Sequence, residues 1–162
     1  MCIRDRYSLD PATGKVYWTQ RYPVDREPQR PAVNIATVRC AGGLLFVSTF
    51  YHGPLMLKLS AHKPAATVLW RGKSNNPARP DGLHILMAAP VLQDGYVYGV
   101  CASGELRCLE AATGKQLWQT YAATGKRADC TSAFLVPQGK RFVVFNDQGE
   151  MILASLTPKG YK

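Results

Sequence analysis

Two segments of the chain, one hundred residues apart, carry the same pattern. Residues 8–18 read Ser-Leu-Asp-Pro-Ala-Thr-Gly-Lys-Val-Tyr-Trp, and residues 108–118 read Cys-Leu-Glu-Ala-Ala-Thr-Gly-Lys-Gln-Leu-Trp. A degenerate copy runs from Leu57 to Trp70, so the three tryptophans are spaced by 52 and 48 residues. A period near 50 residues is typical of solenoids and propellers, in which each unit buries its apolar surface against its neighbours.

Each repeat unit is predicted to consist of antiparallel hairpins. Runs rich in β-branched and aromatic residues, 44–51 and 96–101, are each followed by a glycine turn and a second run, 55–60 and 105–110. This arrangement is typical of β-hairpins. No segment keeps the apolar period of about 3.6 residues that an amphipathic helix requires, so the sequence predicts an all-β fold.

The repeated turn and its tryptophan are interpreted as architecture. In the first copy the Asp10 carboxylate is expected to accept hydrogen bonds from the next backbone N–H groups. Pro11 presets φ at the second position of the turn, and Gly14 supplies its left-handed residue. The tryptophan ring is expected to pack between adjacent sheets, with its N–H reaching a backbone carbonyl. The residues of this motif are Asp10, Thr13, Gly14, Lys15 and Trp18 in the first copy, Trp70 in the middle copy, and Glu110, Thr113, Gly114, Lys115 and Trp118 in the third.

The motif resembles the tryptophan-docking signature of pyrroloquinoline-quinone-type β-propeller repeats, Ala-x-Asp-x-x-Thr-Gly-Lys-x-x-Trp. The chain departs from it at Ser8, Cys108 and Glu110, and the middle copy loses the Thr-Gly-Lys turn and carries a two-residue insertion. The resemblance covers residues 7–160. It implies a β-propeller of four-stranded antiparallel blades.

Counting strands gives about three blades and a partial blade. The expected units are 7–22 (partial), 33–71, 86–121 and 131–162 (partial), with about 13 strands in all. Rings usually need about 4–8 blades to remove their exposed edges, so the chain is expected to be an incomplete ring from a larger protein. Residues 1–6 fit neither a strand nor the repeat and are interpreted as a non-native leader.

Charge and cysteine content narrow the function classes. The formal net charge is +9, but no run of Lys or Arg exceeds two residues, which makes nucleic acid an unlikely partner, and no apolar run is long enough to span a membrane. The five cysteines, odd in number and irregularly spaced, are expected to be buried free thiols. If Ser103-Gly104 is a two-residue turn, Cys101 lies opposite Leu106. Cys108 is then a diagonal neighbour on the same face, beyond disulfide reach.

The sequence offers no catalytic motif. It has no nucleophile elbow, no phosphate-binding loop and no His-Glu-x-x-His pair. Three dispersed histidines, His52, His62 and His84, do not suggest a metal site, and residues 146–149 fit a β-turn better than a calcium loop. A non-enzymatic role is therefore favoured, with no metal and no cofactor expected.

Long connections between blades are the favoured place for binding. Residues 22–32, 71–85 and 122–131 each lead from the outer strand of one blade to the inner strand of the next, so they share one face of a propeller. Loops on a rigid scaffold tend to carry binding residues, although these could equally be solvent-exposed loops without a partner. The candidates are Asn76, Arg79, Asp81 and His84.

Three functional hypotheses follow, the first two from the resemblance and the third from the net charge of +9. The first is a non-catalytic scaffold, similar to the outer-membrane protein assembly BamB-like family, in the periplasm or cell envelope. Its partners would be the remaining blades and an envelope protein. The second is a fragment of a quinone-dependent dehydrogenase with pyrroloquinoline quinone and calcium, although the adjacent cysteine pair usual in such enzymes is absent here. The third is a polyanion-binding module.

Overall fold

The computed structural model describes residues 6–22 and 34–162, and within them it is built from β-strands alone. The first sheet pairs β1 (Arg6–Leu9) with β2 (Val16–Gln20). The second contains β3 (Arg39–Ala41), β4 (Leu44–Thr49), β5 (Gly53–Leu59) and β6 (Ala66–Arg71). The third contains β7 (Val91–Gln93), β8 (Tyr96–Val100), β9 (Leu106–Glu110) and β10 (Gln116–Thr120). The fourth contains β11 (Ala133–Gln138), β12 (Arg141–Asn146) and β13 (Met151–Ala154), followed by the hairpin of β14 (Leu156–Thr157) and β15 (Gly160–Tyr161).

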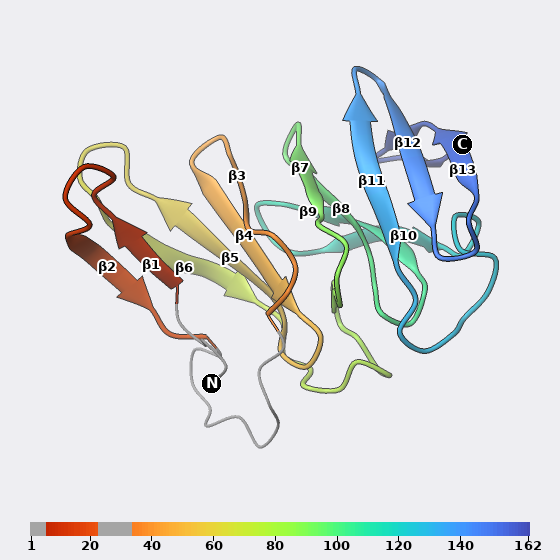
Figure 1. Cartoon of the computed structure of the whole chain (residues 1–162), viewed down its shortest axis with the longest axis horizontal. Coiled ribbons are helices and arrows are strands. Elements are labelled where there is room, and N and C mark those ends of the chain that lie inside the picture. The colour runs from red at the N-terminus through yellow and green to blue at the C-terminus, as the bar shows by residue number, and fades with distance from the viewer. Residues whose placement is uncertain (1–5, 23–33) are drawn as a thin grey trace.

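The sheets are successive blades of an open propeller. Every strand pairs antiparallel with its neighbour in the chain, and the sheets follow one another in sequence order from left to right in Figure 1. The first strands of neighbouring blades approach each other, β3 with β7 and β7 with β11, so they form the inner edges. The strands that carry the tryptophans, β2, β6 and β10, form the outer edges. The predicted all-β propeller of four-stranded antiparallel blades, left as an unclosed ring, is confirmed.

The hydrophobic core is divided among the three spaces between blades. Tyr22, Val47 and Leu55 fill the first space, with Trp18 packed against them. The second and third spaces are larger. The second is lined by Phe46, Met56, Leu83, Ile85, Val97 and Leu109, and the third by Tyr98, Leu106, Leu135, Phe142 and Val144. Each fully buried large side chain contributes about 1.5–3 kcal/mol, so the fold is stabilised blade by blade through nearest neighbours.

Both ends of the blade series leave apolar faces uncovered. The far face of the fourth blade presents Phe134, Val136, Phe145, Met151 and Leu153, and Met151 is 70% exposed. The first blade exposes Tyr7, Leu9, Val16 and Tyr17. These faces are equivalent to those that pack between blades elsewhere in the chain.

Three local expectations need correction. Strand β1 begins at Arg6, inside the segment expected to lie outside the repeat. The expected total of about 13 strands is exceeded, because the fourth unit breaks at Ser155 and continues into the β14–β15 hairpin, which brings the described residues to 15 strands. Residues 1–5 lie outside the described residues.

The third correction concerns the cysteines. The turn after β8 is one residue longer than expected, because the amide of Cys101 bonds the carbonyl of Glu105 at 2.9 Å and Val100 faces Leu106. A one-residue change of register moves side chains to the other face of a sheet. Cys101 therefore packs toward the second blade and Cys108 toward the fourth, on opposite faces. Both are buried and free, but Cys40 and Cys130 are exposed, contrary to expectation.

Candidate functional site

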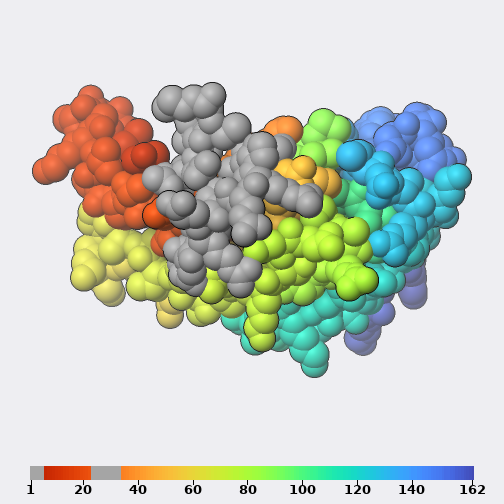
Figure 2. Space-filling model, turned by 90° about the horizontal axis from the view of Figure 1, so that it is seen from below, coloured from red at the N-terminus to blue at the C-terminus, as the bar shows by residue number. Residues whose placement is uncertain are grey.

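The connections from outer to inner strands lie on one face, which we call the loop face. It is formed by residues 72–85, between β6 and β7, and residues 121–131, between β10 and β11. Both run along the lower edge of Figure 1, and Figure 2 views them from below, where the yellow-green residues of the first loop meet the cyan residues of the second. Of the remaining connection, residues 23–33 lie outside the described residues.

Asp81 organises the first loop. Its Oδ2 accepts hydrogen bonds from the backbone amides of Lys73 and Ser74, the latter at 3.0 Å. Its Oδ1 lies 3.5 Å from Nε2 of His84, a contact too long for a well-formed hydrogen bond. The His84 ring and the two amides hold the pKa of the Asp81 carboxyl well below its ordinary value, despite partial burial. The carboxylate therefore folds the loop back on itself.

His84 supports the loop from beneath and has no exposed surface. Its Nδ1 lies 3.0 Å from the carbonyl oxygen of Phe50, in the β4–β5 turn of the second blade. Its ring also fills the space over Gly53, where an added Cβ would stand 2.7 Å from Nε2. His84 is thus a packing residue of the loop face and does not reach its surface.

Asn76 and Arg79 occupy the exposed tip of the same loop. Asn76 Oδ1 accepts the amide of Ala78 at 2.9 Å, and the amide of Arg79 bonds the carbonyl of Asn76 at 3.0 Å. Ser74 Oγ donates to the carbonyl of Arg79 at 2.8 Å. This compact turn presents the Arg79 guanidinium, which has no ion pair in the described part of the chain.

Residues of the third blade and its following loop fasten the loop tip in place. Arg107 Nη1 donates to the carbonyls of Gly82 at 2.7 Å and Pro80 at 3.2 Å. Arg127, from the second loop, donates from Nη2 to the carbonyl of Ala78 at 2.8 Å. Three contacts to backbone carbonyls thus fix residues 78–82 relative to the third blade and the loop that follows it. The sequence analysis did not select these arginines.

A buried acid balances the charge of Arg107. Glu105 Oε1 lies 3.6 Å from Nη2 of Arg107, and both residues are only 5% exposed. Tyr121 donates to the same oxygen at 2.9 Å, and Ser103 donates to the other. Burial alone raises the pKa of Glu105, but the bonds from Ser103 and Tyr121 and the charge of Arg107 outweigh it and lower that pKa. Arg107 stands inside the otherwise apolar run Leu106–Leu109, and this charge in a buried strand could have indicated the ion pair from the sequence.

Two of the three repeat tryptophans dock on the next blade. Trp70 Nε1 donates to the carbonyl of Ala111 at 2.7 Å, and Trp118 Nε1 donates to that of Thr157 at 2.7 Å. The Trp70 ring also lies against Gly114, whose φ is +76° and where a Cβ would stand 2.7 Å from the ring. Trp18 makes no such bond within the described residues.

The turn motifs are held by their own side chains. Asp10 Oδ1 accepts hydrogen bonds from the backbone amides of Ala12 and Thr13, at 2.9 and 3.0 Å. Thr113 donates to Glu110, and the amide of Lys115 bonds Thr113 Oγ1 at 3.1 Å, as that of Lys15 bonds Thr13 Oγ1 at 3.3 Å. These contacts give the motif residues a structural role.

Other polar groups fit turns and offer no metal centre. Asn146 Oδ1 accepts the amides of Gln148 and Glu150, and the amide of Gly149 bonds the carbonyl of Asn146 at 3.2 Å, which is the expected β-turn. Over residues 6–22 and 34–162, no group of three or more His, Cys, Asp or Glu side chains could hold a metal ion. No helix in this part of the chain is long and apolar enough to cross a membrane.

Antiparallel blades, two of which dock on the next through a repeat tryptophan, define the chain as a β-propeller built from pyrroloquinoline-quinone-like repeats. The profile of one such family, described as outer membrane protein assembly factor BamB, matches residues 4–160. The chain belongs to this family.

A solved structure of BamB agrees on the fold. BamB from Moraxella catarrhalis superimposes with a TM-score of 0.58 at 14% identity, over 98% of this chain and 51% of that chain. The chain therefore spans about half the length of that protein. A europium-containing methanol dehydrogenase gives a TM-score of 0.37 at 18% identity, over 76% of this chain and 26% of that chain, which is too low to carry an argument. A search of curated proteins gives no sequence match.

Proposed function

We propose that the chain is part of a non-catalytic propeller scaffold of the cell envelope that binds a protein partner through its loop face. The observation that supports this most directly is the fastening of residues 78–82 by Arg107 and Arg127. A loop held at several carbonyls presents its exposed side chains at fixed positions, which lowers the entropy lost on binding. Asn76, Arg79 and Asp81 are the exposed members of this site.

The charge of the loop face favours an acidic partner. Residues 72–85 carry two cationic side chains and one acidic one, and so do residues 121–131, so the loop face has a net charge of +2. Complementary charge steers association and improves specificity. Because the family is named for outer membrane protein assembly, the partner we propose is an envelope protein of that assembly with an acidic surface.

We propose that further blades cover the exposed face of the fourth blade. The pairs Phe46–Met56 and Tyr98–Cys108 occupy equivalent places in the second and third blades, and both are buried against the following blade. Val143 and Leu153 form the same pair in the fourth blade, yet Leu153 is 59% exposed. An apolar face of this kind is expected to be buried in the complete ring.

The loop face is tested by capture from an envelope extract. Immobilised chain with Arg79 and Asn76 both replaced by alanine should retain several-fold less of the partner band than the unchanged chain. Lys140→Ala is the matched control, because it removes one positive charge from a β-turn at the opposite end of the blades. Equal capture by all three chains would remove the loop face as the binding site.

The quinone-dependent dehydrogenase remains the alternative, with its own test. Calcium and quinone would need a cluster of carboxylate ligands, and the described residues contain none. Addition of pyrroloquinoline quinone and Ca²⁺ should produce neither dye reduction nor tryptophan quenching if the scaffold proposal holds. The polyanion-binding hypothesis predicts instead a steep loss of affinity with salt.

A further inference from the structure

The blade ends opposite the loop face are joined in different ways at the three interfaces between blades. Between the second and third blades, the Trp70 N–H reaches the carbonyl of Ala111, whose own amide bonds the carbonyl of Gly95 at 2.8 Å. Between the third and fourth, Trp118 reaches Thr157. A bonded indole therefore joins the blades at both of these interfaces, although a hollow of about 280 Å³ remains at the second of them, between Tyr98, Phe142 and Thr157.

The first interface differs because the β5–β6 hairpin is longer. Leu59 is the equivalent of Ala111, since its amide bonds the carbonyl of Gly43 at 2.8 Å in the same way. In the third blade the turn begins directly after Glu110, whose amide bonds the carbonyl of Lys115. In the second blade Leu59 is still paired with Ala66, and the turn begins only after Ser60, whose amide bonds the carbonyl of Ala65. Each strand of this hairpin has two added residues, four in all where the sequence suggested an insertion of two, and they move the turn outward by about 7 Å.

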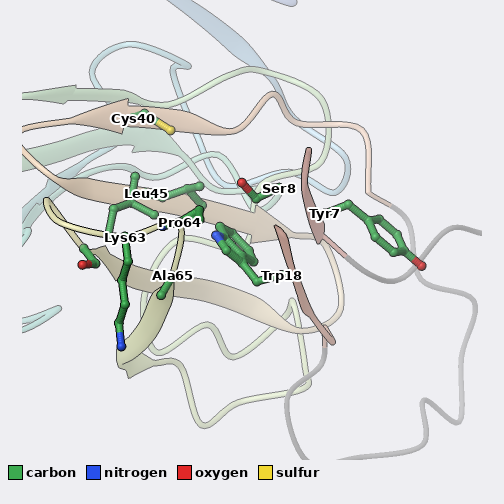
Figure 3. Close-up of a pocket in the computed structure, with 10 residues that line it drawn as sticks. Tyr7, Ser8, Trp18, Cys40, Leu45, Lys63, Pro64 and Ala65 are labelled. Carbon is green, nitrogen blue, oxygen red and sulfur yellow. The ribbon is translucent and has the colours of Figure 1, made fainter. Parts of the chain in front are cut away.

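The result is a hollow beside Trp18. Its volume is about 330 Å³, and it is walled by the indole, Leu45, Leu59 and Pro64, with Ser8 and Ser60 as polar groups. In Figure 3 the indole and the Lys63–Ala65 turn face each other across this space, and Tyr7 points away from it. A second hollow of about 220 Å³ shares Leu59, Ser60, Lys63 and Ala65 with the first and continues to Lys58 and Thr67. We call the two together the Trp18 groove.

The groove is basic and has one unused donor. Lys63 lines both hollows and Lys58 lines the second, and no Asp or Glu lines either. Neither lysine makes an ion pair, and the Trp18 N–H bonds no acceptor, in the part of the chain that the structure describes. A backbone carbonyl is what the other two indoles bind in this position.

We propose that the Trp18 groove binds an extended peptide segment that carries an apolar residue next to an acidic one. A backbone carbonyl of the peptide accepts the Trp18 N–H, and its apolar side chain packs between Leu45, Leu59 and Pro64. Its carboxylate lies near Lys63. This site is at the turn end of the blades, opposite the loop face, so it is independent of the proposed scaffold site.

The test uses a blocked tetrapeptide, acetyl-Gly-Leu-Glu-Gly-amide, and the indole N–H signals in ¹⁵N-correlated NMR spectra. The chain has three tryptophans, so each signal can be assigned with a Trp→Phe variant. The peptide should shift the Trp18 signal and leave those of Trp70 and Trp118 in place. No shift at millimolar peptide, or equal shifts of all three signals, would overturn the proposal.

Affinity measurements with a fluorescently labelled peptide separate the contributions. Lys63→Gln should weaken binding about two- to fivefold, and Trp18→Phe about two- to tenfold. Lys140→Gln and Arg79→Ala should leave affinity unchanged. If Trp18→Phe does not fold, the exposed Lys63→Gln variant still decides the question. Equal binding of the Gln peptide, or equal binding of hexanoate without any peptide, would show that no acidic peptide is recognised.

Discussion

Nη1 of Arg107 lies 2.7 Å from the carbonyl oxygen of Gly82, so a buried cation of the third blade closes the loop that leads out of the second. The same side chain meets the carboxylate of Glu105, which is equally buried. Each blade of the pair therefore depends on the other for the shape of the loop face.

Replacing Arg107 by methionine should destabilise the chain. The stem would still pack, but Glu105 would lose its cation and two loop carbonyls would lose their donor, at a cost of about 3–5 kcal/mol. Urea unfolding measures the loss. The double variant Arg107→Met with Glu105→Gln should recover part of it, because no buried charge is left unpaired. Equal stability of the single variant and the unchanged chain would contradict this account.

The three tryptophans should differ in their contribution to stability. Trp70→Phe and Trp118→Phe each remove an indole donor from a backbone carbonyl, which costs about 0.5–1.5 kcal/mol beyond the smaller ring. Trp18→Phe removes no such bond and should cost less. Thermal unfolding of the three variants under one buffer ranks them. A loss at Trp18 as large as that at Trp70 would show that the first interface is closed in solution.

Two glycines of the repeated turn provide a matched pair. Gly14 and Gly114 have φ values of +72° and +76°, so alanine strains the backbone at both by about 1–2 kcal/mol. Only at Gly114 would the new Cβ also meet the Trp70 ring, adding about 1–3 kcal/mol of overpacking. Denaturant titration of Gly14→Ala and Gly114→Ala should show the larger loss for Gly114→Ala, and the reverse order would refute the docking geometry.

Acid should loosen the first loop through Asp81. Its folded-state pKa is lowered below the ordinary value of 3.8, so the carboxylate stabilises the native state above that value, and this contribution is lost as pH falls through the lower folded pKa. Asp81→Asn should be less stable than the unchanged chain near neutral pH, and the difference should shrink below about pH 4. A difference that stays constant down to pH 2 would show that the charge is not the cause.

The repeat pattern was sufficient to predict the blades, because turn glycines and tryptophans act locally and recur at a fixed phase. Gly14 and Gly114 both adopt the left-handed conformation that their turns require. The face of Cys101 was predicted wrongly, since it depends on one residue of turn length between β8 and β9. Such a difference leaves no mark in the alternation of the strands.

The loop face was located from loop length, but not its internal roles. His84 sits in a polar, proline-rich segment and reads as a surface residue, yet it is buried by a turn that precedes it by more than thirty residues in the chain. Nothing in the sequence around Arg127 indicated a role for it, yet its guanidinium donates to the carbonyl of Ala78, 49 residues earlier in the chain. Contacts of this range depend on how blades meet, which single-sequence patterns do not encode.

The docking bonds of the repeat also have a direction. The N–H groups of Trp70 and Trp118 each donate to a carbonyl oxygen further along the chain, that of Ala111 and that of Thr157. Deleting the last blade would leave the Trp118 N–H without its acceptor, whereas deleting the first pair of strands would break no indole hydrogen bond of the described residues. Shortening the protein from its two ends is therefore unequal, and a stepwise loss of structure under force should begin at the first pair of strands, which no indole bond holds within the described residues.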